Sequence, residues 1–289
     1  MGIWSRELRF GDRGEAREAA VELEELGFGT LWIPGGAGDE ELLPVVGEQL
    51  SATRRVVIAT GILNVFGHDP QDVARAHAEL DGDHPGRFLL GIGIGHAKFL
   101  DADSAARSKK PITVISEYLD ALERFAVAGT SPARVVAALG PKMVRLAGER
   151  TLGVHPYMVP VEHTAVVRDV LGPLPIVAPE LSVVLAGTVE QTRARARQDL
   201  ALYLELPNYV TVWQRLGYGD ADLADGGSDR LVDALYAQGS VEQIGTRVRE
   251  HHDAGADHVC LRVVTNAPMS GVERLPREQW RELAPLASA

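Results

Sequence analysis

The stretch RVVAALGPKMVRLAGER, residues 134–150, decides the fold prediction because it holds one complete strand–turn–helix unit. Its apolar run at 134–139 predicts a buried strand. Gly140 and Pro141 interrupt that run, and proline is favoured at the first position of a helix, so we expect a helix over 141–150. The rest of the chain can therefore be searched for further strand–helix units of this kind.

Strand-like and helix-like segments alternate along the whole chain. The apolar runs predict eight strands, at 3–10, 30–33, 56–60, 87–94, 134–139, 154–159, 181–185 and 258–264. Periodicity and capping signals predict helices at 15–27, 40–53, from Pro70, from Pro111, and at 141–150, 161–171, 188–206, 229–237, 241–254 and 277–286. This order predicts an α/β protein, a TIM (β/α)₈ barrel over residues 1–289 as a single domain, with an insertion at 207–228 between strands seven and eight. An open doubly wound sheet is the alternative.

Composition and charge limit the classes of partner. The 289 residues carry a formal net charge of −11, which argues against general nucleic-acid or membrane-surface binding. No window approaches the roughly 20 apolar residues of a membrane span, and no signal-peptide pattern stands at the N-terminus. The single cysteine, Cys260, lies in an apolar run and is expected to be buried. Together these features predict a cytoplasmic protein.

The turn Leu139-Gly140-Pro141-Lys142-Met143 is the strongest local candidate for a binding site. Active sites of (β/α)₈ barrels lie at the carboxyl ends of the strands, and this turn follows the fifth strand. Proline at the first helical position leaves the N–H groups of Lys142 and Met143 free, and the helix dipole and the lysine favour an anion. We therefore expect a phosphate here; a plain turn with an exposed lysine is the alternative.

His96 is the candidate for proton transfer at the same end of the barrel. It follows Gly91-x-Gly93-x-Gly95, which is not a dinucleotide fingerprint because no helix is predicted directly after it. A histidine there could protonate or orient a substrate, or simply be hydrogen-bonded in a loop. The sequence shows no metal-ligand spacing and no nucleophile elbow, so we expect the chemistry of a bound cofactor.

Several motifs, taken in order, resemble a known superfamily. Residues 59–64 (ATGILN), 69–70 (DP) and 90–96 (LGIGIGH) look like the luciferase-like monooxygenases. Residues 138–143 (ALGPKM), 153–157 (GVHPY), 206–209 (LPNY), 227–232 (GSDRLV) and 253–259 (DAGADHV) narrow the resemblance to the actinobacterial branch of probable coenzyme F420-dependent oxidoreductases.

The resemblance implies roles for individual residues. Gly61–Ile62 falls where the family has a non-prolyl cis peptide behind the deazaflavin ring. Cofactor contacts are implied for Gly61, Ile62, Asn64, Gly93, Gly95, Leu139, Gly140, Pro141, Lys142 and Met143, and substrate contacts for Gly35, His155 and Tyr157. His96 occupies a position where some relatives carry an acid–base carboxylate. The implied reaction is hydride transfer between the cofactor's C5 and a small organic substrate, in a homodimer without a metal.

Two departures from the family pattern leave other functions open. The loop after the second strand, Pro34-Gly35-Gly36-Ala37-Gly38, lacks the acidic residue or histidine that relatives often present there. No basic set matches the sugar-phosphate dehydrogenases of the superfamily, so glucose 6-phosphate is disfavoured. The alternatives are an FMN-dependent luciferase-like monooxygenase and a non-catalytic ligand-binding barrel.

Overall fold

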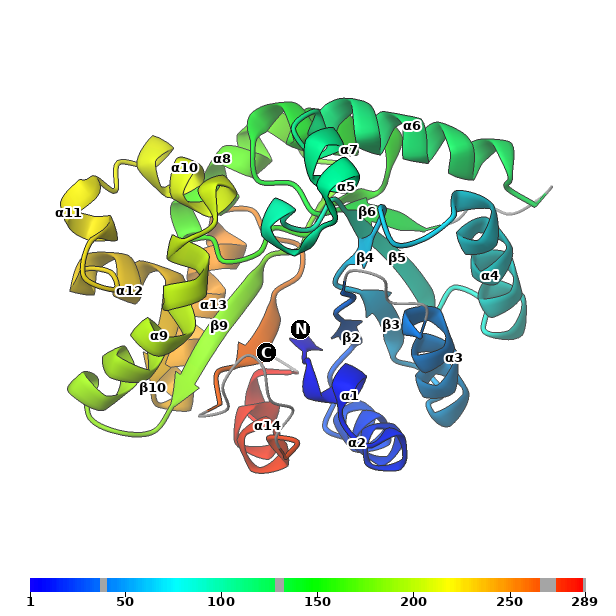
Figure 1. The fold of residues 1–289 in the computed structure, drawn as a ribbon. Coiled ribbons are helices and arrows are strands. Elements are labelled where there is room, and N and C mark those ends of the chain that lie inside the picture. The colour runs from blue at the N-terminus through cyan, green and yellow to red at the C-terminus, as the bar shows by residue number, and fades with distance from the viewer. Residues whose placement is uncertain (37–40, 128–132, 266–273, 288–289) are drawn as a thin grey trace.

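The computed structural model describes residues 1–36, 41–127, 133–265 and 274–287, and helices surround a curled parallel sheet in it (Figure 1). The strands are β1 (Gly2–Trp4), β2 (Thr30–Ile33), β3 (Val57–Thr60), β4 (Leu63–Asn64), β5 (Phe88–Gly93), β6 (Arg134–Val136), β7 (Gly153–Val154), β8 (Ile176–Val177), β9 (Glu180–Leu185), β10 (Tyr236–Gly239) and β11 (Cys260–Val263). The helices are α1 (Glu7–Phe10), α2 (Arg13–Glu25), α3 (Leu42–Ala52), α4 (Pro70–Asp83), η1 (Ala97–Phe99), α5 (Ala102–Arg107), α6 (Pro111–Arg124), α7 (Pro141–Arg150), α8 (Val161–Leu171), α9 (Val189–Leu204), α10 (Pro207–Arg215), α11 (Asp220–Leu223), α12 (Asp229–Leu235), α13 (Val241–Asp253), α14 (Arg277–Leu283) and η2 (Ala284–Leu286).

The sheet closes on itself through residues 176–185. Neighbouring strands follow the order β10-β9-β11-β1-β2-β3-β5-β6-β7-β8, and every pair is parallel. Ala178 and Pro179 alone separate β8 from β9, and the Ala178 N–H donates to the carbonyl of Val154 in β7 at 3.0 Å. The segment that pairs with β7 therefore pairs further on with β11, and the predicted α/β barrel is confirmed.

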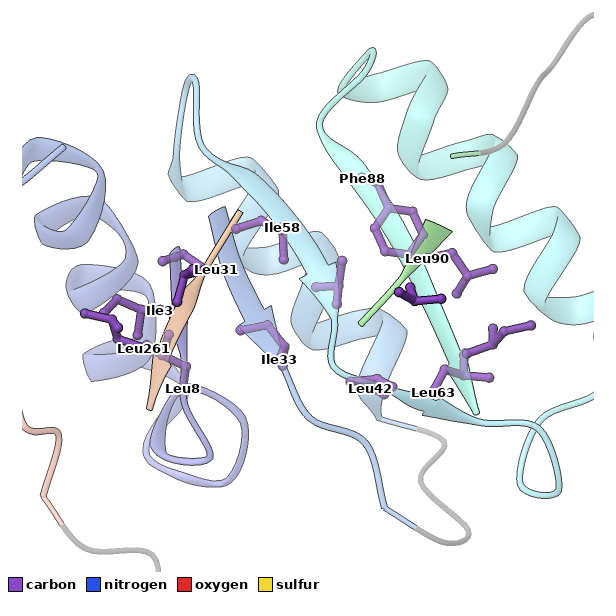
Figure 2. Close-up of a cluster of buried hydrophobic side chains, with 14 of the residues drawn as sticks. Ile3, Leu8, Leu31, Ile33, Leu42, Ile58, Leu63, Phe88, Leu90 and Leu261 are labelled. Atoms are coloured by element: carbon purple, nitrogen blue, oxygen red, sulfur yellow. The ribbon is translucent and has the colours of Figure 1, made fainter. Parts of the chain in front are cut away.

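Side chains of the first strands alternate between the helices and the barrel interior. Ile3, Leu31 and Ile58 pack with residues of the surrounding helices such as Leu8 and Leu42 (Figure 2). Their chain neighbours form a second buried cluster with residues from other sides of the ring: Trp4, Trp32, Ala59, Val135, Ala178 and Cys260. This period of two is what a strand requires, and it fills the barrel with side chains. Cys260 is buried, as expected.

The first predicted strand, 3–10, is too long. Only Gly2–Trp4 is a strand, and Glu7–Phe10 is the helix α1. The hydroxyl of Ser5 accepts a hydrogen bond from the Leu8 N–H at 3.3 Å. Such a local bond offers the backbone a turn instead of a continued ladder, which explains why the strand stops after Trp4.

The sixth predicted strand, 154–159, is also shorter in the structure. It covers Gly153–Val154, because Pro156 has no N–H for the ladder and Met158 has φ +53°, outside the extended region.

The predicted helix 229–237 was wrong at its end, since Tyr236–Gly239 is β10, parallel to residues 182–185 of β9. Burial of Tyr236 and Ala237 against β9 outweighs their local helical pattern.

The segment 207–228 contains α10 and α11 and lies beside α9 and α12 on one side of the barrel (Figure 1). Its aromatic side chains belong to a third buried cluster, separate from the two described above, that includes Met158, Leu200, Tyr209, Trp213 and Tyr236. The indole N–H of Trp213 donates to the Met158 carbonyl at 3.1 Å. This segment is therefore packed onto the strand ends rather than extended away from them.

A homodimer stays a prediction. On helix α6, the positions of Ile112, Val114 and Tyr118 suggest a partner-facing surface beside the core-facing stripe, but Val114 and Tyr118 are buried within this chain. In the described part of the chain, no helix is both long enough and apolar enough to cross a membrane.

Candidate active site

A bulge after β3 brings three of the predicted site residues together. The Gly61–Ile62 peptide is cis, as the resemblance implied. The indole N–H of Trp4 donates to the Gly61 carbonyl at 2.9 Å, and the Gly35 N–H donates to the Ile62 carbonyl at 3.2 Å. The bulge is thus fixed by β1 on one side and by the loop after β2 on the other. Ala37 and Gly38 of that loop lie outside the described residues.

Close packing against this bulge explains three glycines: Gly91 and Gly93 in β5, and Gly95 two residues after the strand. A Cβ atom at Gly91 would lie 2.1 Å from the Thr60 carbonyl oxygen. A Cβ at Gly93 would lie 2.9 Å from Cδ1 of Ile62, and a Cβ at Gly95 2.7 Å from Nδ2 of Asn64. Each glycine therefore faces one residue of the segment 60–64, and the missing side chains let the bulge lie close to β5.

His96 directly follows Gly95, and only one of its two ring nitrogens has a hydrogen-bond partner among the described residues. Its Nδ1 is buried and has no hydrogen-bond partner among the described residues. Burial lowers the pKa of His96 below its ordinary value, and a hydrogen bond with the side chain of Asn208 opposes this shift. The ring centroid of Tyr209 lies 5.5 Å away. At neutral pH His96 is thus an uncharged imidazole with one buried ring nitrogen that bonds no described residue.

The N-terminal end of α7, residues 139–143, has the features of an anion site; we call it the α7 end. The N-cap residue is Gly140, which has no side chain to bond the free N–H groups, and Pro141 follows at the first helical position. Lys142 is exposed, while Met143 is buried and presents only its backbone to the helix end. The imidazole of His163 bonds the Leu139 carbonyl at 2.8 Å and fixes the turn.

Arg215 joins the α7 end from a distant part of the chain. Its Nη1 would lie 3.6 Å from a Cβ at Gly140, so the guanidinium reaches the same turn as Lys142. Sequence reasoning missed Arg215 because it ends α10, 73 positions after Lys142 (215 − 142). Cationic side chains and free N–H groups at a helix end are the donors that a phosphate group requires.

Four aromatic side chains form what we call the aromatic wall: Trp4, Tyr157, Tyr203 and Tyr209. The ring centroids of Trp4 and Tyr157 are 5.2 Å apart, and Tyr209 lies 6.4 Å from Tyr157. The hydroxyl groups of Tyr157 and Tyr203 are hydrogen-bonded at 2.8 Å. Because Tyr209 also neighbours His96, the wall connects His96 with Trp4 and, through Trp4, with the bulge. Asn208 and Tyr209 belong to the LPNY motif, to which the sequence assigned no role.

His155 lies in the barrel interior rather than at the surface of the site. Its side chain is 1% exposed and stacks on Trp32 at a centroid distance of 4.0 Å. Its Nδ1 pairs with the Ala178 carbonyl at 2.7 Å, and burial lowers its pKa to about 4. Because the His155 ring is almost fully buried in this structure, a ligand cannot reach it without a rearrangement. A substrate contact by His155 stays a prediction. Across the described ranges, no group of three or more His, Cys, Asp or Glu residues could hold a metal ion.

Two curated relatives match about half of the chain. A putative coenzyme F420-dependent oxidoreductase of Mycobacterium tuberculosis is 29% identical over 147 residues, which cover 50% of this chain and 41% of that protein. An F420-dependent glucose-6-phosphate dehydrogenase of Microbacterium testaceum is 31% identical over 182 residues, covering 49% of this chain and 54% of that protein. The matches thus span roughly half the length of these relatives.

The fold and the family are supported over a longer range. A solved F420-dependent secondary alcohol dehydrogenase, in complex with an F420–acetone adduct, superposes with a TM-score of 0.72, covering 99% of this chain and 98% of that one. At 15% identity this likeness shows the shared fold. The family model of the luciferase-like monooxygenases matches residues 5–258. The chain therefore belongs to the luciferase-like monooxygenase family.

Proposed function

We propose that this protein is a coenzyme F420-dependent oxidoreductase that transfers a hydride between the deazaflavin C5 and a small organic substrate. The observation that carries the proposal is the close packing of the bulge at residues 61–62 and its neighbours against Gly91, Gly93 and Gly95. His96 follows β5 near this bulge, and the α7 end follows β6, the strand that pairs with β5. The names of the two curated relatives support F420 as the cofactor.

The residues at the α7 end and at the bulge fit such a cofactor. The N–H groups of Lys142 and Met143 and the charges of Lys142 and Arg215 would hold its phosphate, with Leu139, Gly140 and Pro141 shaping the turn. Gly61, Ile62, Asn64, Gly93 and Gly95 would border its ring. When bound, the cofactor supplies the hydride acceptor or donor of the reaction.

His96 is the proposed catalytic residue. Its unpartnered Nδ1 would accept the hydroxyl proton of a substrate that is being oxidised, and would return it in the reverse direction. The lowered pKa of His96 keeps the accepting form dominant at neutral pH. Gly35 reaches the site only through its backbone contact with Ile62, so any substrate contact it makes would be a main-chain one.

The colour of the purified protein, an F420 titration and a substrate panel together separate the proposed function from its alternatives. F420 added to the purified protein should bind, with a change in its fluorescence, and a substrate panel should then change its redox state. A protein that is yellow as purified and releases FMN on denaturation would instead be an FMN-dependent monooxygenase. Binding of F420 without any hydride transfer would indicate a non-catalytic barrel.

A further inference from the structure

The turn after Tyr157 is held in an unusual conformation by three contacts. Met158 has φ +53°, a region that residues other than glycine adopt sparingly. Its N–H donates to Glu180 at 3.1 Å, and its carbonyl accepts from the Trp213 indole at 3.1 Å. Its sulfur accepts from the Ser182 hydroxyl at 3.5 Å. Strand β9 and helix α10 therefore fix this turn from two sides, and with it the direction of the Tyr157 side chain.

A buried group of charges lies directly behind the ring of Tyr157. Arg262 is 6% exposed and bonds Glu180 at 3.1 Å and Asp199 at 2.9 Å. Desolvation raises the pKa of Glu180, and the neighbouring guanidinium opposes that shift. Burying three ionisable groups costs more than an apolar packing of the same volume, so stability does not explain the group. The Arg262 guanidinium carbon lies 5.7 Å from the Tyr157 ring centroid.

The hydroxyl of Tyr157 can donate a hydrogen bond to a ligand when Tyr203 donates the bond that the two hydroxyls share. Burial raises the pKa of Tyr157 well above its ordinary value, so the phenol is uncharged at neutral pH. It is bonded to the Tyr203 hydroxyl, which is buried. Either hydroxyl can donate the shared bond; when Tyr203 donates it, the Tyr157 proton remains for a ligand, and Tyr157 is the more exposed residue of the pair. Arg262 adds no free positive charge because Glu180 and Asp199 neutralise it.

We propose that Tyr157 donates a hydrogen bond to the oxygen atom of a small, uncharged carbonyl or hydroxyl substrate bound against the aromatic wall. This proposal rests on the proposed function. During oxidation, His96 would take the hydroxyl proton, and the carbon that bears this oxygen would give its hydride to C5 of the cofactor. Negative charge then develops on the substrate oxygen, and a fixed neutral donor stabilises it. In the reverse direction the same donor polarises the carbonyl. Glu180, Arg262 and Trp213 are positioning residues for Tyr157.

The test compares Tyr157→Phe with Tyr203→Phe, since each removes one hydroxyl from the same hydrogen-bonded pair. The probes are secondary alcohols of three to eight carbons with F420, and the matching ketones with reduced F420, followed by absorbance of the deazaflavin. We expect Tyr157→Phe to lower kcat about 100-fold, as loss of one oxyanion donor does elsewhere, and Tyr203→Phe to lower it less than about tenfold. The F420 dissociation constant, measured by fluorescence, should stay within about twofold in both variants.

A second readout needs no turnover. Phenolate absorbance near 295 nm is followed from about pH 7 to 10 in the wild type and in Tyr157→Phe. The two curves should show the same titrating tyrosines, because Tyr157 should not ionise in this range. A group that titrates in the wild type and is missing in Tyr157→Phe would overturn the proposal, as would a loss below tenfold in Tyr157→Phe or an equal loss in Tyr203→Phe. F420 binding without turnover of any probe would also overturn it while leaving cofactor binding intact. Failure to bind F420 at all would instead contradict the proposed function. Because phenylalanine keeps the ring, both variants are expected to fold, and thermal melts check this.

Discussion

The α7 end and the aromatic wall lie at the same mouth of the barrel but are built in opposite ways. The α7 end consists of a turn of consecutive residues, backbone N–H groups and two cations that reach in from exposed positions. The wall consists of buried rings from β1, α9 and α10 and a half-buried ring from the loop after β7, backed by a buried ion group. The first depends on backbone geometry and net charge, and the second on individual side chains. Substitutions should therefore have small effects at the α7 end and large effects at the wall and at the bulge.

The largest effect is expected at the bulge that both regions share. In Gly91→Ala the new Cβ would lie 2.1 Å from the Thr60 carbonyl oxygen, and backbone on both sides must move. We expect a loss of about 4 kcal/mol in the free energy of unfolding, measured by urea denaturation. Gly82→Ala in α4 is the matched control, because nothing lies within 4 Å of the added atom and the helix should gain up to about 1 kcal/mol. Equal stability of the two variants would show that the bulge adjusts freely.

The next effect concerns proton transfer beside the wall. His96→Ala should lower kcat by about 10² to 10⁴-fold and leave the F420 dissociation constant nearly unchanged, because the ring acts on substrate. In the wild type, the oxidation rate should rise with pH, and the midpoint of the rise should lie below pH 6.5, since the pKa of His96 is lowered from that value. A midpoint above pH 6.5, or a fully active variant, would remove His96 from the catalytic role.

Stability should also depend on pH through the barrel interior next to the wall. The pKa of His155 is lowered to about 4, whereas it titrates near 6.5 in an unfolded chain, so the unfolded state binds an extra proton between these values. The free energy of unfolding should therefore be highest above pH 6.5 and fall as pH drops toward 4, by about 1.4 kcal/mol per pH unit for this group. His155→Phe keeps a ring against Trp32 and should flatten the slope. An unchanged slope would mean that His155 is protonated in the folded protein.

The smallest effect is expected at the α7 end. Lys142→Met should weaken F420 binding by about 1 kcal/mol, roughly fivefold, because an exposed charge adds to N–H groups that remain in place. Arg145→Met, on the same helix and also exposed, is the control and should change binding less than twofold. The difference should shrink at high salt. Equal effects of the two variants would show that the phosphate lies elsewhere.

The contrast between the two regions also explains what the sequence could predict. The βα units and the turn at 139–143 follow from local patterns, and the family resemblance placed the cis Gly61–Ile62 peptide. The wall could not be read in this way, since Tyr203 meets Tyr157 from 46 positions away and Arg262 meets Glu180 from 82. One signal was present and missed: Arg262 is a charge inside an apolar strand, which requires a buried partner. That residues 1–289 form a single domain stays a prediction.

The central claim, that F420 lies across the bulge with its phosphate at the α7 end, is tested most directly by a competition titration. F420 is titrated into wild-type protein and Lys142→Met, and FMN is then added as competitor. The account predicts F420 binding in the micromolar range or tighter, at least tenfold tighter than FMN, and weaker binding of F420 in Lys142→Met. Tighter binding of FMN than of F420, or F420 binding that is unaffected by Lys142→Met, would contradict it.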